Sequence, residues 1–117
     1  MQTTTPQYIA VQPLLWLQQD GTELRLVARV GTPYAIDERT WACPCELEGH
    51  AGRLPDIFGG GSMQALCLAA RLVRSQLADL IGKGERLVDI EGGDAWDLER
   101  LDAVFGHGFG APPASTP

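Results

Sequence analysis

The feature that most constrains the fold is the glycine run 59–61, which leads directly into the longest amphipathic stretch of the chain. Glycine lets a chain turn sharply from a strand into a helix. We predict a helix over 62–83, capped by Ser62, whose hydroxyl can accept from the free amides of the first turn. Gly82 and Gly84 then end the helix.

The apolar side chains of this helix fall on two sides. The main face, expected to pack on a sheet, carries Leu66, Ala69, Ala70, Val73, Leu77 and Leu80, flanked by Met63 and Ile81. Leu68 and Leu72 are spaced i, i+4 and point away from that face. They are covered either by a C-terminal helix, which we favour, or by another chain.

Four segments before the glycines have the period-two alternation of β-strands. They are 8–18, 22–31, 40–47 and the shorter 53–58, which contains Pro55. Asp20-Gly21 predicts a hairpin between the first two. The fold class is therefore α+β, with a three- to four-stranded antiparallel sheet packed by one long helix. Leu14 and Trp16 of the first strand exceed what one small core needs.

The residues after the long helix predict a short extended segment over 85–90 and a second, short helix. Asp94 is the expected cap of that helix, with Asp97 three residues on as in a capping box. Its apolar stripe is Leu98, Leu101, Val104 and Phe105. We therefore expect a flexible N-terminus over 1–7, a single domain over 8–105 and a disordered tail over 106–117.

Composition excludes several classes of protein. The net charge of −6 argues against nucleic acid or an anionic membrane as the main partner, because both attract basic surfaces. No apolar run is long enough to span a membrane, and the N-terminus does not resemble a signal peptide. Three cysteines, an odd number, fit reduced thiols in the cytoplasm better than a disulfide framework.

The negative charge is concentrated near the C-terminus. Seven acidic residues and two arginines give the segment 85–105 a charge of −5 out of the total of −6. An acidic run is usually a solvated face, and no apolar pocket is implied around these carboxylates. We therefore expect them to contribute to partner binding and not to acid–base catalysis.

Cysteine and histidine supply the only candidates for metal or nucleophilic chemistry. Cys43, Cys45, His50 and Cys67 would form a Cys₃His zinc set or a thiol enzyme. However, the strand alternation places Cys43 and Cys45 beside apolar residues, and buried cysteine is usually a small hydrophobe. We expect no metal and no cofactor.

The glycine run also resembles an anion-binding loop at a helix start. It lacks the lysine of a phosphate-binding loop, and it does not follow a buried parallel strand. We therefore interpret residues 59–61 as a turn.

Two segments carry a resemblance to a known group of proteins. Residues 41–47 (WACPCEL) and 62–69 (SMQALCLA) resemble a family of small, uncharacterised bacterial domains with an antiparallel sheet, a tryptophan–cysteine–proline strand and a Gln-Ala-Leu helix. The resemblance covers roughly residues 22–81, and the family has no settled activity to carry over. The combination of small size, acidic character and α+β fold is also similar to that of bacterial toxin-immunity proteins.

These observations favour a non-enzymatic bacterial protein-binding module in the cytoplasm, in its most specific form an immunity protein that neutralises a basic toxin. The expected partner-binding residues are Asp89, Glu91, Asp94, Asp97, Glu99, Asp102, Trp16, Leu68, Leu72 and Trp96. A self-associating structural or accessory protein, forming a homo-oligomer, is the alternative. The third hypothesis is a Cys/His metal-binding protein or a thiol enzyme.

Overall fold

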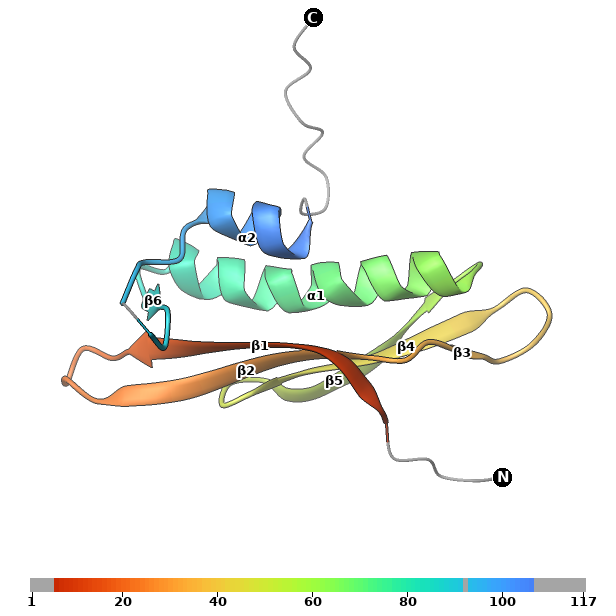
Figure 1. Cartoon of the computed structure of the whole chain (residues 1–117), viewed down its shortest axis with the longest axis horizontal. Helices are drawn as coiled ribbons and strands as arrows, with labels where there is room; N and C mark the ends of the chain where they lie inside the picture. The colour runs from red at the N-terminus through yellow and green to blue at the C-terminus, as the bar shows by residue number, and fades with distance from the viewer. Residues whose placement is uncertain (1–5, 92, 107–117) are drawn as a thin grey trace, which may run out of the picture.

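The computed structural model describes residues 6–91 and 93–106. It contains six strands and two helices (Figure 1). These are β1 (Tyr8–Leu17), β2 (Glu23–Gly31), β3 (Tyr34–Ala35), β4 (Trp41–Glu48), β5 (Gly52–Gly59), α1 (Ser62–Gly82), β6 (Arg86–Val88) and α2 (Leu98–Phe105). The expected flexible residues 1–5 and the expected disordered tail from 107 onward lie outside the described residues.

The strands form one antiparallel sheet, which confirms the predicted class but is larger than the three or four strands expected. In the sheet, β4 pairs with β5 on one edge and with β2 and the short β3 on the other. The β1 strand pairs with β2 and, through residues 15–17, with β6. Of the two additional strands, β3 is two residues long and was not expected, whereas β6 lies within the short extended segment expected over 85–90.

The β1–β2 hairpin forms where the sequence predicts it. The side chain of Asp20 accepts a hydrogen bond from the Thr22 amide at 2.9 Å, and Gly21 adopts a φ of +91° that few other residues tolerate. The hairpin register pairs Leu14 with Leu26, so both side chains face the same side of the sheet, and both are fully buried. Leu14 is therefore part of the core, although the sequence suggested a surplus surface residue.

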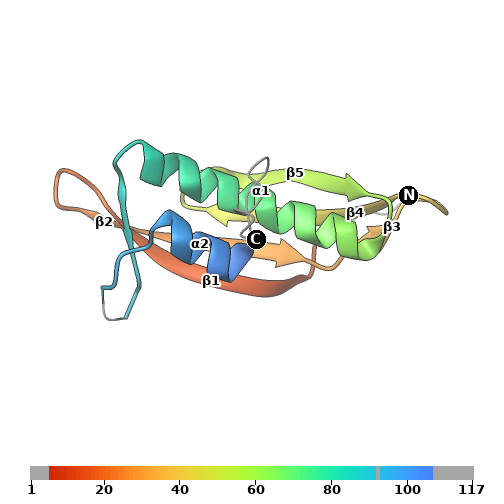
Figure 2. The same ribbon diagram turned by 90° about the horizontal axis from the view of Figure 1, so that it is seen from above.

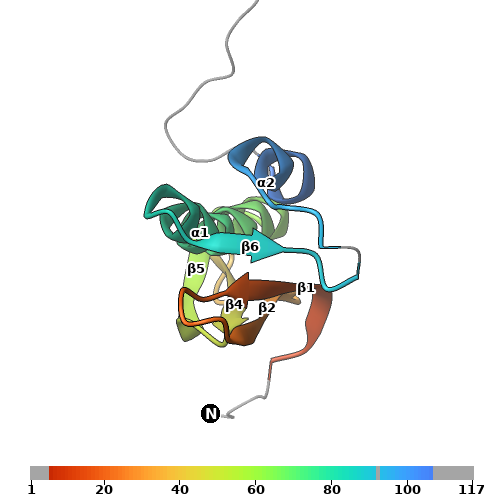
Figure 3. The same cartoon turned by 90° about the vertical axis from the view of Figure 1, so that its left-hand side faces the viewer.

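Both helices cover the same face of the sheet (Figure 3). The buried stripe of α1 is Ala65, Ala69, Val73, Leu77 and Leu80, which joins the core with the β4 side chains Cys43, Cys45 and Leu47. The predicted flanking residue Met63 is instead 71% exposed, because it lies two residues, or about 200° of helical rotation, from the fully buried Ala65. Leu66 and Ala70 are half-buried at the edge of the core.

The caps of both helices differ from the prediction by one to three residues. Gly61 is the N-cap of α1, in extended conformation, and Ser62 is already the first helical residue. The N-cap of α2 is Asp97, whose carboxylate accepts from the Arg100 amide at 2.8 Å; Asp94 lies outside the helix. Leu101 is the fully buried residue of α2 and fixes that helix to the core.

Candidate functional site

The sheet has one face under the helices and one face that no described helix covers (Figures 1 and 3). The register assigns side chains to this open face: Glu46 lies opposite Arg29 on one side and opposite Arg53 on the other. Tyr34 and Phe58 both lie opposite Ala42, from β3 and β5 respectively. The open face therefore carries charged and aromatic residues together.

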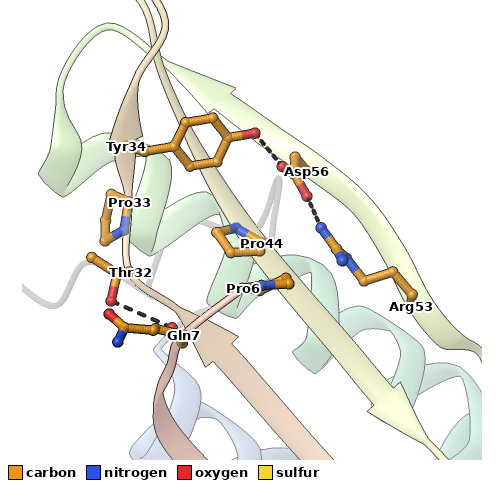
Figure 4. A pocket seen from close by; sticks show the side chains of 8 residues that line it. All are labelled: Pro6, Gln7, Thr32, Pro33, Tyr34, Pro44, Arg53 and Asp56. Atoms are coloured by element: carbon orange, nitrogen blue, oxygen red, sulfur yellow. Dashed lines mark hydrogen bonds and ion pairs between the residues drawn. The ribbon is translucent and has the colours of Figure 1, made fainter. Parts of the chain in front are cut away.

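A pocket of about 380 Å³ lies on this side of the molecule (Figure 4). It is lined by Pro6, Gln7, Thr32, Pro33, Tyr34, Pro44, Arg53 and Asp56. Three proline rings and the Tyr34 ring form much of its wall, and the remaining side chains are polar. The pocket is thus amphipathic, with an apolar wall and a polar wall.

The pocket exists because the start of β1 lies against the end of β2. The Thr32 amide donates to the Gln7 carbonyl at 2.8 Å, which holds residues 6 and 7 beside Pro44. Gly31 permits this close approach, because a Cβ there would lie only 2.6 Å from Cγ of Pro44. A side chain at that position would have to displace the proline that lines the pocket.

The polar wall of the pocket is a closed network of three residues. The Tyr34 hydroxyl donates to Oδ2 of Asp56, and Nη2 of Arg53 lies 2.7 Å from Oδ1 of the same carboxylate. The bond to Asp56 raises the pKa of Tyr34, because it stabilises the protonated phenol. The charges of Arg53 and Asp56 compensate each other, so the wall offers directed hydrogen-bonding groups without net charge.

A second network lies on the same face. The Tyr8 hydroxyl donates to Oε1 of Glu46 at 2.9 Å, and Nη1 of Arg29 bridges Glu46 at 2.5 Å and Glu48 at 2.6 Å. Burial, followed by the bond to Glu46, raises the pKa of Tyr8. These bonds connect β1, β2 and β4 across the sheet, so the open face is held in one arrangement.

The helical side has a different concavity, an apolar groove of about 350 Å³. It is lined by Ala10, Val11, Gln12, Ala28, Val30, Leu66, Ala70, Val104 and Phe105. Figure 2 shows its surroundings from above, with α2 beside α1 and over β1. No lining residue of this groove is charged.

Most of the predicted acidic surface is used within the chain. Asp89 bonds Nη2 of Arg100 through both oxygens at 2.7 Å and accepts from the Trp96 indole at 3.1 Å. Asp102 pairs with Arg74 of α1 at 2.6 Å. These bonds hold α2 and the segment before it onto the body of the domain.

Glu85 and Asp97 are also engaged. Oε1 of Glu85 accepts from the Trp16 indole at 2.8 Å, and Asp97 caps α2. Of the expected acidic binding residues, Glu91, Asp94 and Glu99 remain exposed with no bond to another described side chain.

The predicted aromatic and apolar binding residues are largely covered. Trp96 is only 4% exposed and stacks under the Arg100 guanidinium, 4.1 Å from the ring centroid. Trp16 is half-buried. Leu68 and Leu72 are half-buried too. Arg74 bonds Asp102 of α2, and helical periodicity places the two leucines on the opposite flank of α1, away from α2.

The candidate metal or thiol residues are not brought together. Burial raises the pKa of Cys43 to about 11 and that of Cys45 to about 12, which makes both thiols unreactive at neutral pH. His50 is exposed and packs edge-on against Trp16 at 5.6 Å, while Cys67 is exposed on α1. Within residues 6–91 and 93–106, no three His, Cys, Asp or Glu residues form a group that could hold a metal.

The glycine loop before α1 likewise holds no vacant anion cradle. Oε1 of Gln64 accepts from the Gly60 amide at 2.6 Å, so the side chain of the helix itself occupies that donor. This agrees with the interpretation of residues 59–61 as a turn.

Comparison with known proteins gives one match. The family described as "Domain of unknown function (DUF6968)" matches residues 12–97, well over half of the chain. The chain belongs to this family. No curated protein and no solved structure matches it. The predicted resemblance to an uncharacterised domain family is confirmed to this extent.

The DUF6968 match includes part of the lining of each concavity. Most of the open-face pocket, from Thr32 to Asp56, lies inside the matched range, whereas Pro6 and Gln7 lie before it. The groove wall formed by α2 lies after it.

No helix of the described chain is long and apolar enough to cross a membrane.

The open-face pocket could not be recognised from the sequence. In a regular strand Arg53 and Asp56, three residues apart, would point to opposite faces. The β4–β5 register shifts between Cys43 and Cys45, and this irregularity brings both side chains to the Tyr34 side. The only signal in the sequence is the pair of prolines, Pro44 and Pro55, which interrupt otherwise regular strands.

Proposed function

We propose that this protein acts by binding another protein through the open face of its sheet, and not by catalysis. The observation that carries the proposal is the pocket of about 380 Å³ on that face, beside the exposed aromatic residues Tyr34 and Phe58. Their exposed fractions are 44% and 58%, which is high for large apolar side chains. Aromatic residues and arginine are the residue types enriched in protein interfaces.

The chemistry of the pocket supports a protein ligand over a charged small molecule. Arg53 is already neutralised by Asp56, so an anionic ligand would have to displace a formed ion pair. The proline rings and Tyr34 offer apolar contact, and Gln7 and Thr32 offer donors and acceptors. A peptide segment, with apolar side chains and backbone hydrogen-bonding groups, matches this combination.

The more specific form of the proposal is a bacterial immunity protein that neutralises a basic toxin in the cytoplasm. Its support is the exposed carboxylates of Glu91, Asp94 and Glu99, which would attract a basic partner and accelerate association. Self-association through the open face is the alternative form, since Tyr34 and Phe58 would serve a second copy equally well.

The test is affinity capture from the native host with the full chain, followed by measurement of the binding constant with the protein recovered. The double variant Tyr34→Ala/Phe58→Ala should lose about 30-fold in affinity, which corresponds to about 2 kcal/mol for a hot-spot pair. Leu98→Ala, which removes a 48% exposed side chain of α2, is the matched control and should bind as the unmodified chain does. Circular dichroism checks that both variants are folded.

Equal binding by the double variant and the control would overturn the proposal for this face. Light scattering on the purified chain separates the self-association form, which predicts a dimer that the double variant dissociates. The toxin form also requires an association rate that falls with added salt, and a salt-independent rate would contradict it.

A further inference from the structure

The open-face pocket has an aromatic wall that is fixed in place. Figure 4 shows the Tyr34 side chain reaching from β3 toward β5, where its hydroxyl donates to Asp56. The ring is therefore held at both ends, by the backbone of β3 and by this hydrogen bond, while Tyr34 stays 44% exposed. A fixed and accessible aromatic ring offers contact area to a ligand at little cost in conformational entropy.

The other apolar parts of the wall are proline rings. Pro6, Pro33 and Pro44 line the pocket together with Tyr34. Burial of a proline side chain costs almost no side-chain entropy, because the ring has no free rotamers to lose. The apolar wall is thus preorganised, and a ligand that is itself rigid can pack on it without rearrangement of either surface.

The hydrogen-bonding groups of the pocket are unequally occupied. Each oxygen of the Asp56 carboxylate already accepts a bond, one from Tyr34 and the other from Arg53. The Gln7 carbonyl accepts from both the amide and the hydroxyl of Thr32, at 2.8 and 3.3 Å. The guanidinium of Arg53, by contrast, has several N–H groups and bonds Asp56 through Nη2, so donors remain for a ligand. This inventory favours a ligand that accepts hydrogen bonds and donates few.

We propose that the open-face pocket binds a proline-rich segment of the protein partner in the polyproline II conformation. Prolyl residues have no N–H group, so such a segment accepts hydrogen bonds through its carbonyls and donates few. Its carbonyls are accessible to Arg53, and its rings can pack on Tyr34. Proline-rich segments dock on aromatic surfaces because the polyproline II helix is ordered before it binds. This inference rests on the proposed function, since it names the segment of the partner that enters the pocket.

Other peptide segments fit the pocket less well. A basic segment would compete with Arg53 for Asp56, and an acidic one would compete with Asp56 for Arg53, although these two side chains already form an ion pair at 2.7 Å. An extended segment without proline would bring N–H groups, and each one buried without an acceptor costs free energy. A proline-rich segment leaves the ion pair intact and brings few N–H groups.

The experiment measures binding of a fluorescein-labelled decaproline peptide to the full-length chain by fluorescence anisotropy. A peptide of equal length that alternates glycine and serine is the control probe, since it has N–H groups and no rings. We expect decaproline to bind about tenfold more tightly than the control probe, and Tyr34→Ala to weaken decaproline binding by about tenfold, as for the loss of an aromatic anchor. Leu98→Ala, which removes an exposed side chain of α2, is the matched control variant and should bind decaproline as the unmodified chain does.

Amide NMR spectra of the unmodified chain give a second measurement that does not depend on the folding of a variant. Titration with decaproline should shift the amide resonances of Gly31, Thr32, Tyr34 and Arg53. Equal affinity for the two probes, or shifts confined to residues away from the pocket, would overturn the inference. The proposed function would still stand in that case if Tyr34→Ala/Phe58→Ala weakened binding of the captured protein, so the two failures are distinguishable.

Discussion

The turn before α1 offers a sharp test of the packing argument, because its glycines differ in what a side chain would meet. A Cβ added at Gly59 would lie 2.7 Å from the backbone nitrogen of Ala65 and 3.1 Å from its Cα. These are backbone atoms of the first turn of α1, so they cannot move away as a flexible side chain could. At Gly60 the nearest atom is Oε1 of Gln64 at 3.5 Å, an ordinary contact.

The two substitutions to alanine should therefore change stability in opposite directions. Overpacking against a fixed backbone costs about 1–3 kcal/mol, while replacing glycine at a compatible position gains about 0.4–1 kcal/mol through the unfolded state. Gly59→Ala receives both contributions and should lose about 1–2 kcal/mol. Gly60→Ala should gain about 0.5 kcal/mol, since its amide can still donate to Gln64.

Urea denaturation followed by circular dichroism measures both free energies of unfolding, and the unmodified chain is the reference. The predicted difference between the two variants is about 2 kcal/mol, well above the error of the method. Free energies that agree to within about 0.5 kcal/mol would refute the reasoning, because the close approach of strand and helix would then not be what requires Gly59.

Three further predictions concern the burial of particular side chains. Leu101→Ala should cost about 2–5 kcal/mol by leaving a cavity beneath α2, whereas Leu98→Ala should stay within about 0.5 kcal/mol; thermal unfolding measures both. At pH 8 iodoacetamide should modify Cys67 alone, as mass spectrometry would show by a single adduct, and two or more adducts on the folded chain would contradict the assigned burial. Because the folded pKa values of Cys43 and Cys45 are raised from 9.0 to about 11 and about 12, their contribution to stability should be present below pH 9 and be lost as the pH rises through those values.

The sequence alone determined the elements whose patterns are local. The β1–β2 hairpin follows from strand alternation and the Asp20-Gly21 turn, and α1 follows from its 3.6-residue apolar period. Both are observed within one residue of their predicted ends. Their pattern is written in consecutive residues, so no knowledge of distant partners is needed to recognise it.

The tertiary structure decided the elements that exist only through distant pairing. The sequence indicates that residues 85–90 are extended, but β6 joins the sheet only because residues 15–17 of β1 offer it a free edge. Likewise Asp89 becomes a structural ion-pair partner only because α2 brings Arg100 beside it. A run of acidic residues in a sequence does not show whether their carboxylates are solvated or form bonds within the fold.

The candidate site belongs to this second class. Tyr34 lies on β3, whereas Arg53 and Asp56 lie on β5, and an irregularity in the β4–β5 register brings all three side chains together. The pocket also needs Gln7 beside Thr32, a contact between residues 25 positions apart. Sequence periodicity specifies the face of an element on which a side chain lies. Which faces meet depends on register and on the whole core, and only the folded chain settles that.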